Sequence, residues 1–339
     1  MRFLAGTYTN LGGPGVAALE AANGKLTYLD ECRVVQNPNY LILSRDRTTV
    51  YAAASMGGGE KGAVASFRLN GTSLTPLCIQ PTGGDDVCHI ALSPDEDVLY
   101  SANYSSGSVS AFPVRDGYIF PREQLFRHRG GSGVVPDRQE AAHTHQCAFR
   151  PGTDEMFVCD LGRDEILIYT PDEETGLRMH TSTVRVSPGS GPRHLLFLSE
   201  DRFLLVSELS NQLTDYRRTE DGWTAVSTLS TLPPGCEKSD GAAAVRAFGD
   251  TVFVTNRGCD SVARFSSAGG IRLLDVIPIQ GRFPRDVMPL SSSEFIAANQ
   301  RSGTVEWVKD GRTVCELSVP GAVCLLPIGE SRPIFPNFS

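Results

Sequence analysis

The chain has 339 residues, of which 40% are hydrophobic and 21% charged, as is typical of a soluble globular protein. The net charge of −8 argues against nucleic acid as a partner, because phosphate backbones bind basic surfaces. No stretch approaches the roughly 20 apolar residues of a membrane span, and the N-terminal MRFLAGTYTN lacks the apolar core of a signal peptide. We therefore expect a cytoplasmic protein with no membrane partner.

Seven similar units follow one another along the chain. In each unit an apolar residue ends a short hydrophobic run, a small polar loop follows, and a second alternating run begins. The positions that mark the units are Phe3, Tyr51, Tyr100, Phe157, Leu204, Phe253 and Ile296, which are 43 to 57 residues apart. The runs are rich in Val, Leu, Phe and Tyr and are bounded by Pro, Asp, Gly and Ser, which indicates strands and hairpins.

Seven all-β units, each with room for four strands, predict an all-β fold, a seven-bladed β-propeller formed by residues 1–339 as a single domain. A pair of β-sandwiches, the alternative, does not explain the sevenfold phase. The segment GAVCLLPI (321–328) has no second half of its own. We expect it to close the first blade beside the N-terminal strand, which would leave the ring without an open edge. Residues 113–142 are expected to form a long surface loop and are a candidate lid.

The repeat also predicts which residues meet at one end of the blades. The innermost strand and the next strand run in opposite directions, so the start of the first lies beside the end of the second. The innermost strands begin at Tyr40, His89, His145, Arg193, Ala242 and Arg285. The second strands end at Asn103-Tyr104, Asp160, Glu208, Asn256-Arg257 and Asn299-Gln300. His145 fits this phase if its strand contains one bulged residue. Histidines, arginines and two acids thus converge around the central channel.

Each of these residues also has a structural explanation. Asp160 and Asn256 could hold loop backbone, and His194, which is expected to point away from Arg193, is equally well explained as a core histidine. An arginine at the start of a buried strand is costly unless an acid or an anionic ligand meets it, so Arg193 favours an anion-binding site. His143 and His145 have no clear third partner, which argues against zinc, and we expect neither a metal nor another cofactor.

The nine cysteines are scattered, odd in number and without a CxxC pair. Most lie in apolar, strand-like runs. We expect all of them to be buried, reduced thiols, as in a cytosolic protein, and none is marked as a catalytic nucleophile.

Motifs of one family extend over nearly the whole chain. They include CHIALSPDEDVLYSANYSSGSVSAF, RQEAAHTHQCAFRPG, PGSGPRHLLF, SELSNQLTDY and TNRGCDSVARF. These segments resemble the lactonase family of seven-bladed propellers, which includes bacterial 6-phosphogluconolactonases and fungal carboxymuconate lactonising enzymes. The resemblance implies a metal-independent site whose catalytic residues are His145, Arg193, Glu208 and Arg257. Ala244, where the family often has glutamate, and Cys259, where it usually has histidine, depart from the pattern.

The expected function is hydrolysis of a small anionic lactone or sugar phosphate, with 6-phosphoglucono-1,5-lactone as the first candidate. His145 or Glu208 would be the general base, and of the two catalytic arginines one would stabilise the oxyanion and the other would hold the anionic end of the substrate. The residues expected to bind the substrate are His89, Asn103, His143, Asp160, His194 and Arg285. Two other functions remain open: a propeller that binds a ligand or protein without catalysis, and a cycloisomerase that closes a lactone with the same residues.

Overall fold

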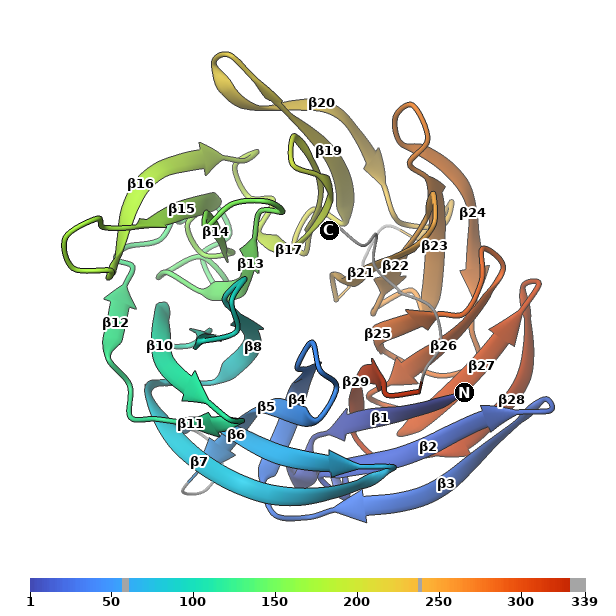
Figure 1. The fold of residues 1–339 in the computed structure, drawn as a ribbon. Coiled ribbons are helices and arrows are strands. Elements are labelled where there is room, and N and C mark those ends of the chain that lie inside the picture. Colours follow the sequence, from blue (N-terminus) through green and yellow to red (C-terminus); the bar gives the residue numbers. More distant parts are fainter. Residues whose placement is uncertain (57–60, 237–239, 330–339) are drawn as a thin grey trace.

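The computed structural model describes residues 1–56, 61–236 and 240–329, and in that part of the chain nearly all regular structure is β-strand. The strands form seven antiparallel sheets arranged as blades around a central axis (Figure 1). One short 3-10 turn, Thr9–Leu11, is present, and the described residues contain no α-helix. The seven-bladed β-propeller predicted from the repeat is confirmed.

The first three blades are formed by the first twelve strands of the chain together with its last strand. The blade at the chain termini contains β29 (Ala322–Pro327), β1 (Arg2–Thr7), β2 (Val16–Ala22) and β3 (Lys25–Cys32). The second contains β4 (Gln36–Leu43), β5 (Thr49–Met56), β6 (Lys61–Asn70) and β7 (Ser73–Asp85). The third contains β8 (Val87–Leu92), β9 (Val98–Asn103), β10 (Ser108–Arg115), β11 (Tyr118–Ile119) and β12 (Gln124–Arg127).

The other four blades have four strands each. The fourth contains β13 (Thr144–Phe149), β14 (Met156–Asp160), β15 (Glu165–Pro171) and β16 (Arg178–Arg185). The fifth contains β17 (Pro192–Ser199), β18 (Arg202–Ser207), β19 (Gln212–Thr219) and β20 (Gly222–Ser230). The sixth contains β21 (Ala242–Phe248), β22 (Thr251–Asn256), β23 (Ser261–Ser266) and β24 (Arg272–Pro278). The seventh contains β25 (Pro284–Pro289), β26 (Glu294–Asn299), β27 (Thr304–Lys309) and β28 (Arg312–Ser318).

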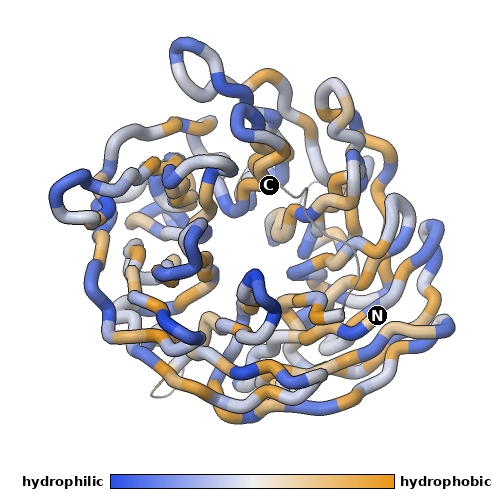
Figure 2. The backbone as a smooth tube through the Cα atoms, viewed as in Figure 1, coloured by the Kyte–Doolittle hydropathy of each residue, from blue (hydrophilic) through white to orange (hydrophobic). Residues whose placement is uncertain are grey.

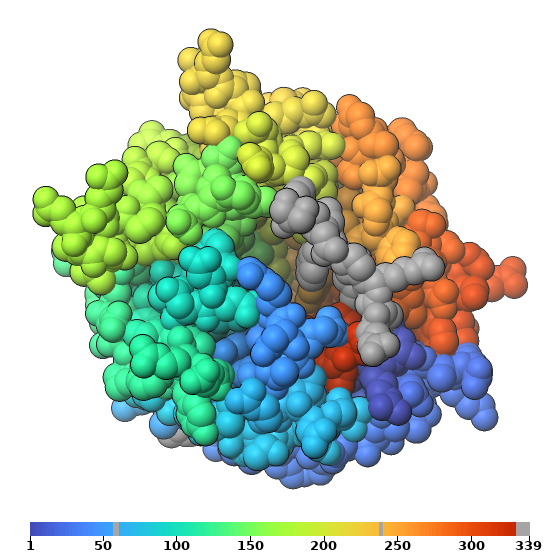
Figure 3. All heavy atoms as spheres, viewed as in Figure 1, coloured from blue at the N-terminus to red at the C-terminus, as the bar shows by residue number. Residues whose placement is uncertain are grey.

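The two ends of the chain share one blade. Strand β29 pairs antiparallel with β1, so that Leu325 lies opposite Ala5 and Pro327 lies opposite Phe3. The C-terminal strand is therefore the innermost strand of the first blade, as expected from the unmatched segment 321–328. Successive parts of the chain then occupy successive sectors of a ring (Figure 3).

The insertion between residues 113 and 142 is more regular than predicted. Strand β10 continues to Arg115, and both β11 and β12 pair with it, so β12 serves as an outer strand of the third blade. The expectation of an entirely irregular loop was wrong, because the alternation in QLFR (124–127) is too short to be distinguished from loop in the sequence. The remaining residues of the insertion lead toward the start of β13.

Hydrophobic clusters fill the spaces between neighbouring blades. Phe3, Phe157 and Phe253, which mark three of the repeat units, are fully buried. Phe157 and Phe203 lie in one cluster and pack with ring centroids 6.0 Å apart across two blades. Burying one such side chain contributes about 2–3 kcal/mol, so the large apolar residue at this repeated position stabilises the junctions between blades. Hydrophilic residues gather in the loops that join the strands (Figure 2).

Bulges near the channel decide which side chains reach it. In the innermost strands β8, β13, β17 and β25 the pairing register skips one residue, and the skipped residues are Cys88, His145, Arg193 and Arg285. A bulged residue is left out of the ladder and its side chain is re-aimed. The bulge predicted for His145 is thus present in other blades as well. Cys88, and not His89, occupies the position equivalent to Arg193.

Candidate active site

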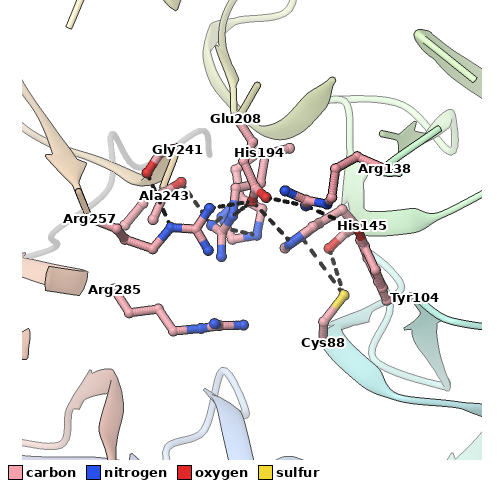
Figure 4. Close-up of polar contacts among 12 residues, drawn as sticks. Cys88, Tyr104, Arg138, His145, His194, Glu208, Gly241, Ala243, Arg257 and Arg285 are labelled. Carbon is pink, nitrogen blue, oxygen red and sulfur yellow. Dashed lines mark hydrogen bonds and ion pairs between the residues drawn. The ribbon is translucent and has the colours of Figure 1, made fainter. Parts of the chain in front are cut away.

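Glu208 lies at the centre of the polar group in the channel (Figure 4). It directly follows β18, and its side chain is only 3% exposed. Its Oε2 accepts a hydrogen bond from Nε of Arg193 at 3.0 Å and contacts Nη2 of Arg257 at 2.8 Å. Its Oε1 accepts a hydrogen bond from Nη2 of Arg138. One buried carboxylate therefore holds three guanidinium groups.

The charge state of Glu208 follows from these neighbours. Burial alone would raise the pKa of this carboxyl, but Arg257 and Arg193, together with His145 and Arg138, lower it by more, and the net pKa lies far below the usual range. The carboxylate is therefore ionised at neutral pH, and both of its oxygens are already occupied by arginines. Such a group is a weak base, which leaves it to orient the arginines.

His145 lies beside Glu208 at the centre of the candidate site. Its Nε2 lies 4.0 Å from Oε2 of Glu208, and its ring is buried. Burial, and then the positive charge of Arg193, hold the pKa of His145 well below its usual range. The imidazole is therefore neutral and has a lone pair that can accept a proton from water. Sγ of Cys88 lies 3.8 Å from its Nδ1.

Backbone carbonyl groups orient two of the arginines. Nη1 of Arg193 donates to the carbonyl oxygen of Ala243 at 2.8 Å, and Nε of Arg257 donates to that of Gly241 at 3.1 Å. Gly241 has a φ of 97°, and a Cβ there would lie 2.6 Å from Cγ of Glu208 and 2.8 Å from Nη2 of Arg257. Glycine is therefore required at this position, because any side chain would displace both groups.

Arg285 differs from the other arginines of the site. It comes from the bulge of β25, and its Nη1 donates to Oε1 of Gln300 at 3.3 Å. Within the described residues it forms no ion pair with a carboxylate, and its guanidinium carbon lies 5.4 Å from the centre of the Tyr8 ring. Four arginines thus surround a single carboxylate, and the excess of positive charge suits an anionic ligand.

Beside this group a cavity of about 80 Å³ extends into the channel, lined by Tyr40, Cys88, Arg193, His194 and Arg285 among others. The ring of His194 lies 5.1 Å from that of His145 and 5.4 Å from that of His89. His194 was expected to point away from Arg193, but Nη1 of Arg193 lies 3.4 Å from its Nδ1. The prediction was wrong, because the bulge at Arg193 brings the side chains of both Arg193 and His194 to the channel. The ring of His89 packs at a tilt against that of Tyr40, with centroids 4.1 Å apart, and its buried Nδ1 has no hydrogen-bond partner among the described residues.

Two of the predicted substrate-binding residues bond mainly to the protein itself. Nδ2 of Asn103 donates to the hydroxyls of Ser108 and Ser110, and the residue is fully buried. Asp160 accepts the backbone N–H of His143 at 2.8 Å and bonds to Nδ1 of His128 at 2.6 Å. The structure therefore places Asn103 and Asp160 as supports of the loops around the site.

His143 lies at the edge of the site. Its ring stacks on that of Tyr104, with centroids 4.6 Å apart. Its Nδ1 lies 3.1 Å from the carbonyl oxygen of Tyr104, and its Nε2 lies 3.0 Å from Oε1 of Glu140.

Within the described residues, no group of three or more His, Cys, Asp or Glu side chains is arranged to hold a metal ion. No helix in the described part of the chain is long and apolar enough to cross a membrane.

The repeat did not predict Arg138 as a site residue, because the period of the strands does not extend through the insertion. A signal was nevertheless present, since Arg138 is the first residue of RQEAAHTHQCAFRPG, one of the segments that resemble the lactonase family. Its Nη2 also donates to the hydroxyl of Tyr104 at 3.1 Å.

The cysteines depart from the expectation in two respects. Cys78, Cys88 and Cys315 are half-buried, although all nine were expected to be buried. Cys236 and Cys259 form a disulfide, with their Cα atoms 6.5 Å apart, so the prediction that every thiol is reduced was wrong. The other seven are free. Their spacing in the sequence gives no sign of this pair, because Cys236 lies in the connection from the fifth blade to the sixth and Cys259 in the loop between β22 and β23, which meet only in the folded chain.

Comparison with known proteins agrees with this geometry. The model of a family described as lactonase, seven-bladed β-propeller, matches residues 2–324. The chain belongs to this family. This lactonase is 30% identical to the 6-phosphogluconolactonase of Bacillus subtilis (strain 168), over 97% of this chain and 95% of that protein.

Solved structures extend the comparison. This lactonase is similar to the periplasmic gluconolactonase of Pseudomonas aeruginosa, with a TM-score of 0.88 and 27% identity over 97% of this chain and 100% of that one. A protein from Lactobacillus plantarum matches with a TM-score of 0.85 and 26% identity, over 96% of this chain and 98% of that one. The predicted resemblance to the lactonase family is confirmed.

Proposed function

We propose that this lactonase hydrolyses 6-phosphoglucono-1,5-lactone to 6-phosphogluconate. The observation that carries the proposal is the neutral His145 beside a carboxylate held by three arginines, with a fourth arginine, Arg285, free of any carboxylate among the described residues. Such a site can activate water and attract a substrate with several negative charges. The name of the Bacillus subtilis relative supports the phosphorylated substrate.

The proposed location is the cytoplasm, which the seven free thiols favour and the disulfide does not.

In the proposed mechanism His145 is the general base. A water molecule attacks the lactone carbonyl carbon while Nε2 of His145 accepts a proton from that water. The C–O bond to the ring oxygen then breaks, and the same nitrogen returns the proton to the alkoxide that leaves. The product is an open-chain carboxylic acid, which ionises at neutral pH. Glu208 is assigned to orient the arginines, since guanidinium groups occupy both of its oxygens and leave neither free to accept a proton from water.

Arg193 and Arg257 are assigned to the oxyanion. Both contact the same oxygen of Glu208, so their guanidinium groups converge on one place in the site. Positive donors aimed at the developing negative charge lower the barrier of ester hydrolysis. Because the two arginines act at one place, the anionic end of the substrate needs a different cation.

The direct test measures acid release from freshly prepared 6-phosphoglucono-1,5-lactone against the spontaneous rate, with and without EDTA. We expect acceleration that survives EDTA and that falls by about 10²- to 10³-fold in Arg193→Ala, the usual effect of losing one oxyanion donor. An unaccelerated reaction with the wild-type protein would contradict the proposed substrate, and loss of activity in EDTA would contradict the metal-independent mechanism.

A further inference from the structure

We infer that Arg138 and Tyr104 form a binding subsite for the phosphate group of the substrate. The inference rests on the proposed function and adds to it, because it places the end of the substrate that does not react. Neither residue belongs to the four catalytic positions that the family resemblance implies.

Arg138 and Tyr104 have hydrogen-bond donors for which the described residues provide no acceptor. Both hydrogen bonds of the Arg138 side chain use one nitrogen, Nη2, which donates to Glu208 and to the hydroxyl of Tyr104. Within the described residues, Nε and Nη1 of Arg138 have no hydrogen-bond acceptor, which leaves three N–H groups of the guanidinium for a ligand. The Tyr104 hydroxyl accepts from Arg138, so its own proton is free to be donated. Phosphate oxygens bind such a planar donor group well.

The position of Arg138 matches the reach of the substrate. Its side chain is 40% exposed, whereas those of Arg193 and Arg257 are 4% and 8% exposed. In Figure 4 its guanidinium approaches Glu208 from the side opposite to Arg257 and Arg285. A lactone whose carbonyl lies against His145 and the two buried arginines can extend its tail toward the exposed side of the site. Arg138 stands on that open side, next to the reacting centre.

The protein holds this pair in place before any ligand binds. The backbone N–H of Arg138 donates to the carbonyl of Val135 at 3.0 Å. The next residue, Gln139, is fully buried, and its amide donates to the carbonyl of Leu161 at 2.9 Å and accepts from the N–H of Val135 at 3.1 Å. Tyr104 is fixed by its stack on His143. Arg138 and Tyr104 therefore lose little conformational entropy when an anion binds, and this favours affinity.

The test compares two lactones that differ only in the phosphate, 6-phosphoglucono-1,5-lactone and glucono-1,5-lactone. The quantity measured is the ratio of their kcat/KM values. In Arg138→Gln we expect this ratio to fall by about tenfold to a hundredfold, mainly through KM, as for the loss of charge-assisted hydrogen bonds. In Tyr104→Phe, which keeps the contact between Arg138 and Glu208, we expect a smaller fall of about threefold to tenfold.

Arg127→Gln is the matched control, because it removes one exposed positive charge from the same insertion, and its ratio should stay within about twofold of wild type. An equal loss for both lactones in Arg138→Gln would overturn the subsite, since Arg138 would then act only through Glu208. A ratio that falls in Arg285→Gln but not in Arg138→Gln would also overturn it and assign the phosphate to Arg285.

Calorimetric binding of 6-phosphogluconate and gluconate separates this inference from the proposed function. If the wild-type protein hydrolyses neither lactone, the proposed function fails. The subsite still stands if 6-phosphogluconate binds more tightly than gluconate and Arg138→Gln removes most of the difference. Equal affinity of the wild-type protein for the two acids would overturn it.

Discussion

At the scale of single residues, the roles of Glu208 and His145 depend on their neighbours more than on their chemical type. Both are groups that can act as a base, and from the sequence both were open candidates. We propose His145 as the base, because arginines occupy both oxygens of Glu208, whereas Nε2 of His145 lies 4.0 Å from the nearer of those oxygens. Side-chain contacts of this kind cannot be inferred from the spacing of a repeat.

The buried histidines of the channel give the protein a predictable pH dependence of stability. Burial, and then the charges of Arg246 and Arg193, lower the pKa of His89 to about 3 from an ordinary value of 6.5. Between these values the unfolded chain binds a proton that the folded chain does not. The free energy of unfolding therefore falls as the pH decreases below about 6.5, by up to about 1.4 kcal/mol per pH unit for this residue. His145 and His194 act in the same direction.

Urea denaturation of the wild-type protein and of His89→Gln at about pH 7 and about pH 5 measures this effect. We expect the loss of stability between the two pH values to be smaller in His89→Gln by up to about 2 kcal/mol. The same loss in both proteins would show that His89 is not neutral in the folded state.

At the scale of structural elements, strand positions were more predictable than the direction of individual side chains. The phase of the repeat placed Arg193 and Arg285 at the channel, and both are there. It failed for His194 and for the equivalence of His89 with Arg193, because a bulge adds one residue without changing the alternating pattern on either side. The bulges are therefore visible only in the pairing of the strands.

The disulfide beside the site is a second element that changes stability. Cys259 follows Arg257 by two residues, and the bond closes a loop of 23 residues. In the chain-entropy account such a crosslink contributes about 3 kcal/mol by restricting the unfolded chain. We expect dithiothreitol to lower the free energy of unfolding of the wild-type protein by about this amount. Cys236→Ser should be less stable from the start and should not respond to the reductant; an equal response of the two proteins would contradict the assignment.

At the scale of the whole molecule, the ring and its closure follow from the sequence, whereas the complete site does not. Seven units and one unmatched strand at the C-terminus were enough to predict the propeller. The site, however, combines side chains from five blades with Arg138, which no unit of the repeat contains. Its position depends on how residues 128–142 cross from the third blade to the fourth, and hydrophobic periodicity carries no information about that path.

We propose that His145 is the base of a hydrolytic site built around Glu208, and the removal of its imidazole tests this assignment most directly. We would measure kcat/KM for 6-phosphoglucono-1,5-lactone with the wild-type protein and with His145→Gln. The exposed His180, changed to Gln in parallel, is the control. We expect kcat/KM to fall by about 10²- to 10⁴-fold in His145→Gln and to change little in His180→Gln. A folded His145→Gln that keeps kcat/KM within about threefold of the wild-type value would contradict it.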